Sequence, residues 1–125
     1  MIQIPCDAVR DALNADFEFR HAARYWDACV RLGIGDRPLC VRIVQGQVEE
    51  IRPWVPTDSL DVGIEASTQE WEKLLAPVPR PFYQSLFAAA AHHDVALSGD
   101  PMDSYAYMGA LTRMLDVMRT RVVFH

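Results

Sequence analysis

Two segments in the first half of the chain alternate hydrophobic and polar residues with the period of a β-strand. The hydrophobic members are Val30, Leu32, Ile34, Leu39, Val41 and Ile43. Because the "GDRP" between the two series is a turn signal, the pattern predicts a hairpin in which the series pair in reverse order, beginning with Val30 opposite Ile43. All six side chains then share one face, whereas a one-residue slip would scatter them across both faces.

The opposite face of this hairpin carries Cys29, Arg31, Cys40 and Arg42. The predicted pairing sets the two arginines opposite each other, where like charges repel. We therefore expect Glu49 or Glu50 to come alongside from the next strand, "QVEEI". That strand follows a turn at Gly46, where "QGQ" suits a loop of two or three residues, so its register stays open. Further strands are expected at "DVGIEA" and through Val95 and Leu97.

The segments outside the predicted strands contain signals that mark the starts of helices. Asn14 is the expected N-cap of a helix through "ADFEFRHAARY", with Asp16 and Glu18 near its positive end. A short helix is expected before it, at "CDAVRDAL". Ser67 and Glu70 form a capping box ahead of "WEKLL".

Two prolines mark the starts of the later helices. Pro81 suits the first turn of a helix through "FYQSLFAAAAHH", and Asp100 with Pro101 supplies a cap and a first-turn proline for the last helix, where Asp103 adds negative charge. Helices segregated from a mainly antiparallel sheet predict an α+β fold. With no repeat and no long linker, one domain over residues 1–125 is expected.

The final helix has a wider apolar surface than a helix on a sheet requires. Four of the five methionines fall in "MDSYAYMGALTRMLDVM". The apolar side chains cover an arc of roughly 200°, against a little over ~100° for an ordinary stripe. Two explanations stay open: a neighbouring helix covers the excess as plain core, or one flank lines a cavity in which soft methionine side chains adapt to a ligand.

Composition and charge narrow the classes of function. Half of the 125 residues are hydrophobic and 23% are charged, which is typical of a folded domain. The formal net charge is −5, and the cations, eleven arginines and Lys73, form no cluster, so neither nucleic acid nor an anionic membrane surface is an expected partner. No apolar run approaches the roughly 18 residues of a spanning helix, so no stable membrane insertion is expected.

The cysteines and the chain termini indicate a cytoplasmic protein. Cys6, Cys29 and Cys40 are odd in number and sit at no zinc spacing, and "MIQIPCDAVR" has no leader pattern. The tail "RVVFH" carries no peroxisomal address. The phosphate-loop, dinucleotide, nucleophile-elbow and zinc-protease motifs are missing from the sequence, and no cofactor or metal is expected.

Four segments together resemble the sterol-carrier-protein type-2 family. They are "ADFEFRHAARYWDACVRLGI", "LCVRIVQGQVEEI", "DVGIEASTQEWEKLL" and "VALSGDPMDSYAYMGALTRML", in that order. They are similar, respectively, to the family's first helix and strand, its glycine-turned hairpin, its strand with a capped helix, and its ending of a small-apolar strand, Gly-Asp and a final helix. The likeness spans about nine-tenths of the chain and rests on order and spacing, with "SGD" its most specific piece.

This resemblance implies a five-stranded, mainly antiparallel sheet with helices packed on one face. In the family a hydrophobic tunnel lies between sheet and helices, walled partly by the final helix, and holds fatty acyl chains, sterols or related lipids. The resemblance thus implies a non-enzymatic carrier or storage protein for a hydrophobic small molecule. The residues it implies for contact with the ligand are Met108, Leu111, Leu115, Met118, Trp71, Phe82, Leu86 and Phe87.

The sequence departs from the family pattern in two places. Before the last strand the family tends to have glycine, whereas "HHD" stands here, so a different tunnel mouth is expected. The peroxisomal tail of eukaryotic members is also absent. Since the family includes domains without a known ligand, the fold by itself is only an associational argument for lipid binding.

Two other functions remain open beside lipid binding. The first is a small cyclase or isomerase acting on a hydrophobic metabolite, with His92, His93 and Asp94 as proton handlers; a partly exposed helix end explains the same residues. The second is an accessory or dimerisation module, possible as a homodimer, in which Trp54 of a proline-flanked loop meets another chain.

Four further side chains have a structural and a functional interpretation. Arg80 and Arg113 are candidates to meet a carboxylate head group, or they are solvated arginines. Cys29 and Cys40 are expected to approach each other on neighbouring strands. A buried thiol pair is favoured over a redox centre there, because no C-x-x-C motif and no flanking base is present.

Overall fold

Five strands form a mixed sheet in the computed structural model, which describes residues 2–78, 81, 83 and 86–124. The elements, in chain order, are β1 (Ile2–Gln3), α1 (Cys6–Ala15), α2 (Phe17–Ala22), β2 (Ala28–Ile34), β3 (Leu39–Val44), β4 (Gln47–Pro53), β5 (Val62–Ala66), α3 (Thr68–Leu74), α4 (Leu86–His92), β6 (Val95–Gly99), α5 (Pro101–Ala106), α6 (Met108–Arg119) and β7 (Val123–Phe124). The order across the sheet is β4-β3-β2-β5-β6, and only the β2–β5 pair is parallel. The predicted α+β class and the five mainly antiparallel strands are confirmed.

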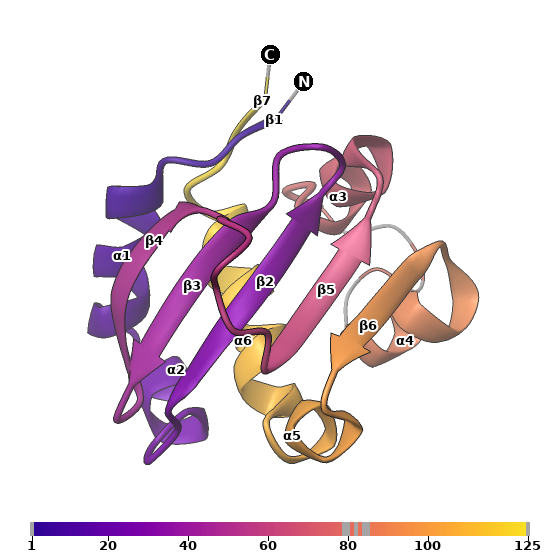
Figure 1. Ribbon diagram of the computed structural model, residues 1–125. Helices are drawn as coiled ribbons and strands as arrows, with labels where there is room; N and C mark the ends of the chain where they lie inside the picture. The colour runs from indigo at the N-terminus through magenta and orange to yellow at the C-terminus, as the bar shows by residue number, and fades with distance from the viewer. Residues whose placement is uncertain (1, 79–80, 82, 84–85, 125) are drawn as a thin grey trace.

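The helices and the long β4–β5 loop lie on opposite faces of this sheet (Figure 1). Helices α1, α2, α4 and α6 pack behind it, while the loop crosses its other face, which we call the open face. A separate two-stranded ladder, β1–β7, joins the two ends of the described chain and was not expected from the sequence.

The β2–β3 hairpin has the predicted face and a different register. Val30 lies opposite Val41, and Leu32 opposite Leu39, which is a shift of two residues from the predicted pairing. A two-residue shift returns every side chain to the same face, so the buried set is unchanged. Arg42 therefore lies opposite Cys29, and the predicted pairing of Arg31 with Arg42 is wrong. On its other side Arg42 lies opposite Glu50 of β4, and its Nε atom is 3.5 Å from a carboxylate oxygen of Glu49, so the acidic partners expected from the next strand are present.

The turn from β3 to β4 resolves the register that the sequence left open. Gln45 and Gly46 form a two-residue loop, both with positive φ. A Cβ atom at Gly46 would lie 2.8 Å from the carbonyl oxygen of Ala23, so the turn requires glycine for its conformation and for its close contact with the helical layer. An irregularity in the ladder between Arg42 and Ile43 takes up the extra residue of β4.

The N-cap predicted at Asn14 is wrong, because Asp16 caps this helix. The Asp16 carboxylate accepts the amide N–H of Phe19 at 2.8 Å, so α2 begins at Phe17, two residues later than expected, after the separate helix α1. Asn14 instead lies inside α1. Its side-chain amide exchanges two hydrogen bonds with the backbone of Val48, at 2.8 and 2.9 Å, and so anchors α1 to β4.

Two of the later helices also differ from the prediction. The Ser67 cap on α3 is confirmed, and the Asp100 carboxylate caps α5 as expected. The expected single last helix is divided into α5 and α6, because Tyr107 leaves helical geometry and stacks on Trp26 with ring centroids 4.3 Å apart. Helix α4 spans Leu86–His92, so Pro81 lies outside it.

An ion pair fixes α6 against the start of α2. Arg113 donates two hydrogen bonds to the Asp16 carboxylate, at 2.8 and 2.9 Å. This guanidinium, helped by the Phe19 N–H, holds the pKa of Asp16 below its ordinary value. Such a carboxylate stabilises the fold when it is ionised, and this contribution is lost as the pH falls through the lowered pKa of the folded state.

We expect Asp16→Asn to lower the free energy of unfolding by about 1 kcal/mol at pH 7, because asparagine keeps the cap and loses the ion pair. The difference from the parent protein should be constant above about pH 5 and should shrink as the pH falls into the range where Asp16 is protonated. Urea unfolding at several pH values measures it. A difference that grew at low pH would contradict this assignment.

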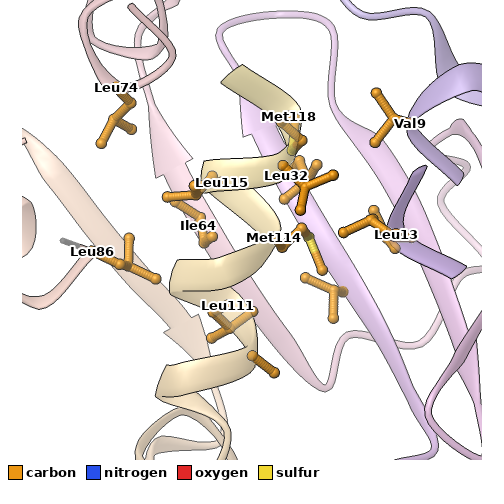
Figure 2. Packing of buried hydrophobic residues seen from close by; sticks show 14 of the residues in the cluster. Val9, Leu13, Leu32, Ile64, Leu74, Leu86, Leu111, Met114, Leu115 and Met118 are labelled. Atoms are coloured by element: carbon orange, nitrogen blue, oxygen red, sulfur yellow. The ribbon is translucent and has the colours of Figure 1, made fainter. Parts of the chain in front are cut away.

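The hydrophobic core lies between the sheet and the helices, with α6 at its centre (Figure 2). Leu111 and Leu115 lie on the side of α6 toward Leu86, and Met114 and Met118 lie on the side toward Leu13. All of these side chains are at most 1% exposed. Neighbouring helices on both flanks therefore cover much of the wide apolar arc that the sequence shows.

Candidate ligand-binding cleft

An open cleft of about 680 Å³ lies where α4, β6 and α5 meet the first residue of α6. Its lining residues are mostly apolar or small: Phe87, Ala90, Ala91, Leu97, Ser98, Gly99, Pro101, Ser104, Tyr105 and Met108. Each helix contributes residues at helical spacing, so one face of α4 looks across the cleft at one face of α5. Small residues on α4 leave the space, and larger residues at the edges enclose it.

The sequence "SGD" builds one end of this cleft. Gly99 has a φ of +83°, and a Cβ atom there would lie 2.3 Å from the carbonyl oxygen of Asp61. The next amide, that of Asp100, donates to the same carbonyl oxygen at 2.8 Å. Glycine therefore lets the chain leave β6 tightly against the start of β5 and turn directly into α5, whose cap is Asp100.

The exposed apolar side chains around the cleft show which part of it faces solvent. Phe87 is 67% exposed and Tyr105 is 82% exposed, while Ser104 is only 6% exposed. The two aromatic rings thus form the rim and the serine lies at the base. Large rings left in water beside an apolar depression are typical of a surface that binds another molecule.

The structure divides the eight predicted ligand contacts into two groups and leaves one outside. Phe87 and Met108 line the cleft. Five others belong to the hydrophobic core and are at most 1% exposed: Leu111, Leu115, Met118, Trp71 and Leu86. Phe82 lies outside the described residues. A ligand-binding role for all eight residues stays a prediction.

Several cleft residues were not predicted, and the sequence carried a partial signal for them. Ala90 and Ala91 follow Phe87 at offsets of three and four, as Ser104 and Tyr105 follow Pro101. Two short helices with such matched faces favour a shared groove. Nothing in the spacing shows that the two faces come together across Leu97, since that depends on how β6 places α4 and α5.

The predicted proton handlers lie in a different depression, of about 470 Å³. There the ring of His93 stacks on Tyr83 at 3.7 Å, and the Tyr83 hydroxyl donates to Glu70 at 2.7 Å. The bond from Tyr83, helped by Lys73, lowers the pKa of Glu70. Within the described part of the chain, no three His, Cys, Asp or Glu side chains are grouped to hold a metal ion.

Neither arginine proposed for a carboxylate head group is seen in the cleft. Arg113 is held by Asp16 on another side of α6, and Arg80 lies outside the described residues. Trp54, expected at a lid or interface, lies on the open face, where the guanidinium of Arg31 sits 5.2 Å from its ring centroid. No described helix is long and apolar enough to cross a membrane.

By sequence, the chain matches no family model and no curated protein. By structure, it is similar to sterol carrier protein 2, with a TM-score of 0.75 over 92% of this chain and 93% of that one, at 18% identity. A Thermus thermophilus protein described as a possible sterol carrier protein gives a TM-score of 0.70 at 19% identity, covering 90% of this chain and 82% of its own. The ubiquinone synthesis protein UbiJ gives 0.59 at 15% identity over 90% of each chain. The chain therefore has the sterol-carrier-protein type-2 fold, which confirms the resemblance at the level of fold.

Proposed function

We propose that this protein binds a hydrophobic small molecule, a fatty acyl chain, a sterol-like compound or another lipid, and acts as a non-catalytic carrier or store. The observation that supports this proposal most is an apolar cleft of about 680 Å³ on a sterol-carrier fold, with Phe87, Tyr105 and Met108 around it. Structures with this fold include proteins described as sterol carriers, and one described as a ubiquinone synthesis protein. All three names point to apolar small molecules.

The cleft needs no charged contact to bind such a ligand. Each buried methylene contributes about 0.8 kcal/mol, so a sixteen-carbon chain gains on the order of 10 kcal/mol. Immobilising it takes back about 4 kcal/mol or more. The remainder corresponds to a Kd in the micromolar range, with little selectivity for chain length. Met108 suits such a site because its side chain adapts to different apolar shapes.

The core next to Met108 is the inner limit of this site. Leu111 follows Met108 by one turn of α6 and is fully buried, with Leu86 and Leu115 beside it. A ligand longer than the cleft would continue along α6 by separating side chains that are now packed together. The core residues that were predicted to line a tunnel would then contact a long ligand. With a short ligand they would remain packed in the core.

We expect Met108→Glu to weaken binding of a fluorescent fatty-acid analogue at least 20-fold, because a carboxylate would enter the apolar cleft. Met102→Glu is the matched control: Met102 is 77% exposed and does not line the cleft, so binding should stay within twofold of the parent value. Fluorescence titration measures both affinities. Leu111→Glu is unsuitable for this purpose, because a charge at a fully buried position disrupts folding itself.

Native mass spectrometry of freshly purified protein provides a second test. A carrier with an apolar cleft should retain a host lipid, which appears as added mass and is lost on organic extraction. Binding that is equal in the Met108→Glu and Met102→Glu variants would exclude the cleft as the site. Protein that neither carries a lipid nor binds the fatty-acid or a sterol analogue would exclude the proposed function.

A further inference from the structure

Two cysteine thiols touch on the open face of the sheet, opposite the ligand-binding cleft. The sulfur atoms of Cys29 on β2 and Cys40 on β3 lie 3.0 Å apart, and both thiols are free. They sit at diagonal positions of the antiparallel ladder, since Cys29 lies opposite Arg42 and Cys40 lies opposite Arg31. The approach predicted from the sequence is therefore confirmed, and the distance exceeds the ≈2.05 Å of a disulfide bond by only about 1 Å.

The β4–β5 loop, residues 54–61, crosses the open face of the sheet (Figure 1). Its hydrogen bonds tie it to the strands around this pair of cysteines. At one end the backbone N–H of Cys29 donates to the Asp61 carboxylate at 2.8 Å, and the N–H of Asp61 donates to the Cys29 carbonyl at 3.2 Å. Further along, Asp58 accepts two hydrogen bonds from Arg52 of β4, at 2.7 and 2.9 Å. The loop is thus hydrogen-bonded to β2 and β4, the strands on either side of Cys40, and these bonds help to keep the two sulfur atoms together.

A small reagent can reach only one of the two sulfurs with ease. Cys40 is fully buried, whereas Cys29 is partly exposed. Cys29 also lines an open depression of about 510 Å³, whose walls include Arg42 and Asp61. The reagent therefore meets Cys29 first, with Cys40 directly behind it.

We propose that Cys29 and Cys40 form a dithiol site that a low-molecular-weight disulfide, such as oxidised glutathione, converts to a disulfide bond between β2 and β3. The Cys29 sulfur attacks one sulfur of the small disulfide, breaks its S–S bond and releases one molecule of thiol, which leaves a mixed disulfide on Cys29. The Cys40 sulfur then attacks the Cys29 sulfur and releases the second small thiol. Overall, two protein thiols are oxidised and one small disulfide is reduced to two thiols, which take up the two protons.

The groups around Cys29 determine the rate of the first step. Burial, the Cys40 thiol and the carboxylates of Asp58 and Asp61 together raise the pKa of Cys29 to about 12, despite the guanidinium of Arg42 opposite it in the ladder. Because only the thiolate attacks, the rate should rise about tenfold per pH unit between pH 7 and pH 9, well below that pKa. The site is thus slow to oxidise at neutral pH, and the nearness of Cys40 makes the second step fast.

The test uses intact-mass measurement of a Cys6→Ser variant, which removes the third cysteine and leaves the pair. After incubation with oxidised glutathione at pH 8.5, this protein should lose the mass of two hydrogens, bind no iodoacetamide, and recover both properties on reduction with dithiothreitol. Adding Cys40→Ser should instead leave one glutathione attached at Cys29. Adding Cys29→Ser should leave Cys40 unmodified, because the reagent cannot reach it directly.

Two results would overturn the proposal. One is a stable glutathione adduct on the Cys6→Ser protein with both cysteines present, which would mean that Cys40 does not displace it. The other is unchanged mass in the native protein under conditions in which the urea-unfolded protein reacts. Both readouts are chemical and come from protein with an unaltered Cys29–Cys40 pair, so they do not depend on how well the Cys29→Ser and Cys40→Ser variants fold.

Discussion

Changing Trp71 to alanine is expected to lower the free energy of unfolding by about 4 kcal/mol. Trp71 is among the largest side chains with no exposed surface, and it belongs to the hydrophobic core between sheet and helices. Its indole N–H also donates to the carbonyl oxygen of Gly33 at 3.0 Å, which ties α3 to the end of β2. Alanine would leave a cavity and remove this hydrogen bond together. Urea unfolding, followed by circular dichroism, measures the change.

Two further variants separate the contributions of packing and hydrogen bonding. Trp71→Phe keeps most of the ring and loses the bond to Gly33, so its effect should be about 1 to 2 kcal/mol. Phe17→Ala removes a ring that is 77% exposed, and its effect should stay within about 0.5 kcal/mol. A Trp71→Ala loss below about 2 kcal/mol would show that the surrounding core collapses into the space, contrary to close packing around Trp71.

Replacing Arg119 with methionine is expected to lower the free energy of unfolding by about 3 kcal/mol. The Arg119 side chain is only 9% exposed. It donates to the carbonyl of Leu74 at 2.7 Å and to that of Tyr83 at 2.8 Å, and it pairs with Asp116. Burial lowers the pKa of Arg119, and Asp116 opposes that shift. Methionine would fill part of the volume and leave both carbonyls and the carboxylate without this partner.

Arg119→Lys and Arg121→Met serve as controls for this prediction. Lysine has no planar fork and cannot reach both carbonyls at once, so Arg119→Lys should recover only part of the loss. Arg121 is exposed and its side chain bonds only to the adjacent Thr120 among the described contacts, so Arg121→Met should change stability by less than about 0.5 kcal/mol. Equal losses at Arg119 and Arg121 would refute the role given to Arg119.

The sequence predicts the sheet well because alternation decides which face each side chain takes. It does not decide the register of the β2–β3 hairpin, since pairings two residues apart, such as Val30 with Val41 or with Ile43, bury the same set. Turn signals settle such cases only when the turn is tight, as at Gly46. The turn at "GDRP" does not settle it. Strand β2 continues beyond its last pair with β3 and pairs with β5 up to Ile34 opposite Ala66, so a strand distant in sequence fixes the β2–β3 register.

The helix predictions failed where a contact distant in sequence outweighs a local signal. Asn14 and Asp16 are both good capping residues, and the choice falls on Asp16 because Asn14 binds the backbone of Val48 on β4. The periodicity of the last helix runs without interruption through Tyr107. The helix divides there because Tyr107 stacks on Trp26, more than eighty residues away. Neither contact leaves a pattern in the neighbouring sequence.

The same limit applies to the candidate site. The apolar stripe identifies which side chains of α6 avoid water. It does not show how far along the helix the surrounding core extends. Leu111 and Met108 belong to one stripe, yet Leu111 is enclosed by the core, while Met108 lies at the edge where α4 and α5 diverge. The family resemblance predicted that a ligand binds. The cleft could be located only from the position of α4 relative to α5 in the structure.

The position of α6 has a consequence for how the chain matures during synthesis. A chain leaves the ribosome amino end first, and a domain generally folds as a unit. Here the last long helix lies at the centre of the helical layer, in contact with α1, α2 and α4, and Phe124 pairs with Ile2. The nascent sheet must therefore keep the apolar face that α6 covers, including Leu32 and Ile64, open until residues 108–119 have been translated. The interval before α6 emerges is the time at which this chain is most exposed to aggregation and to chaperones.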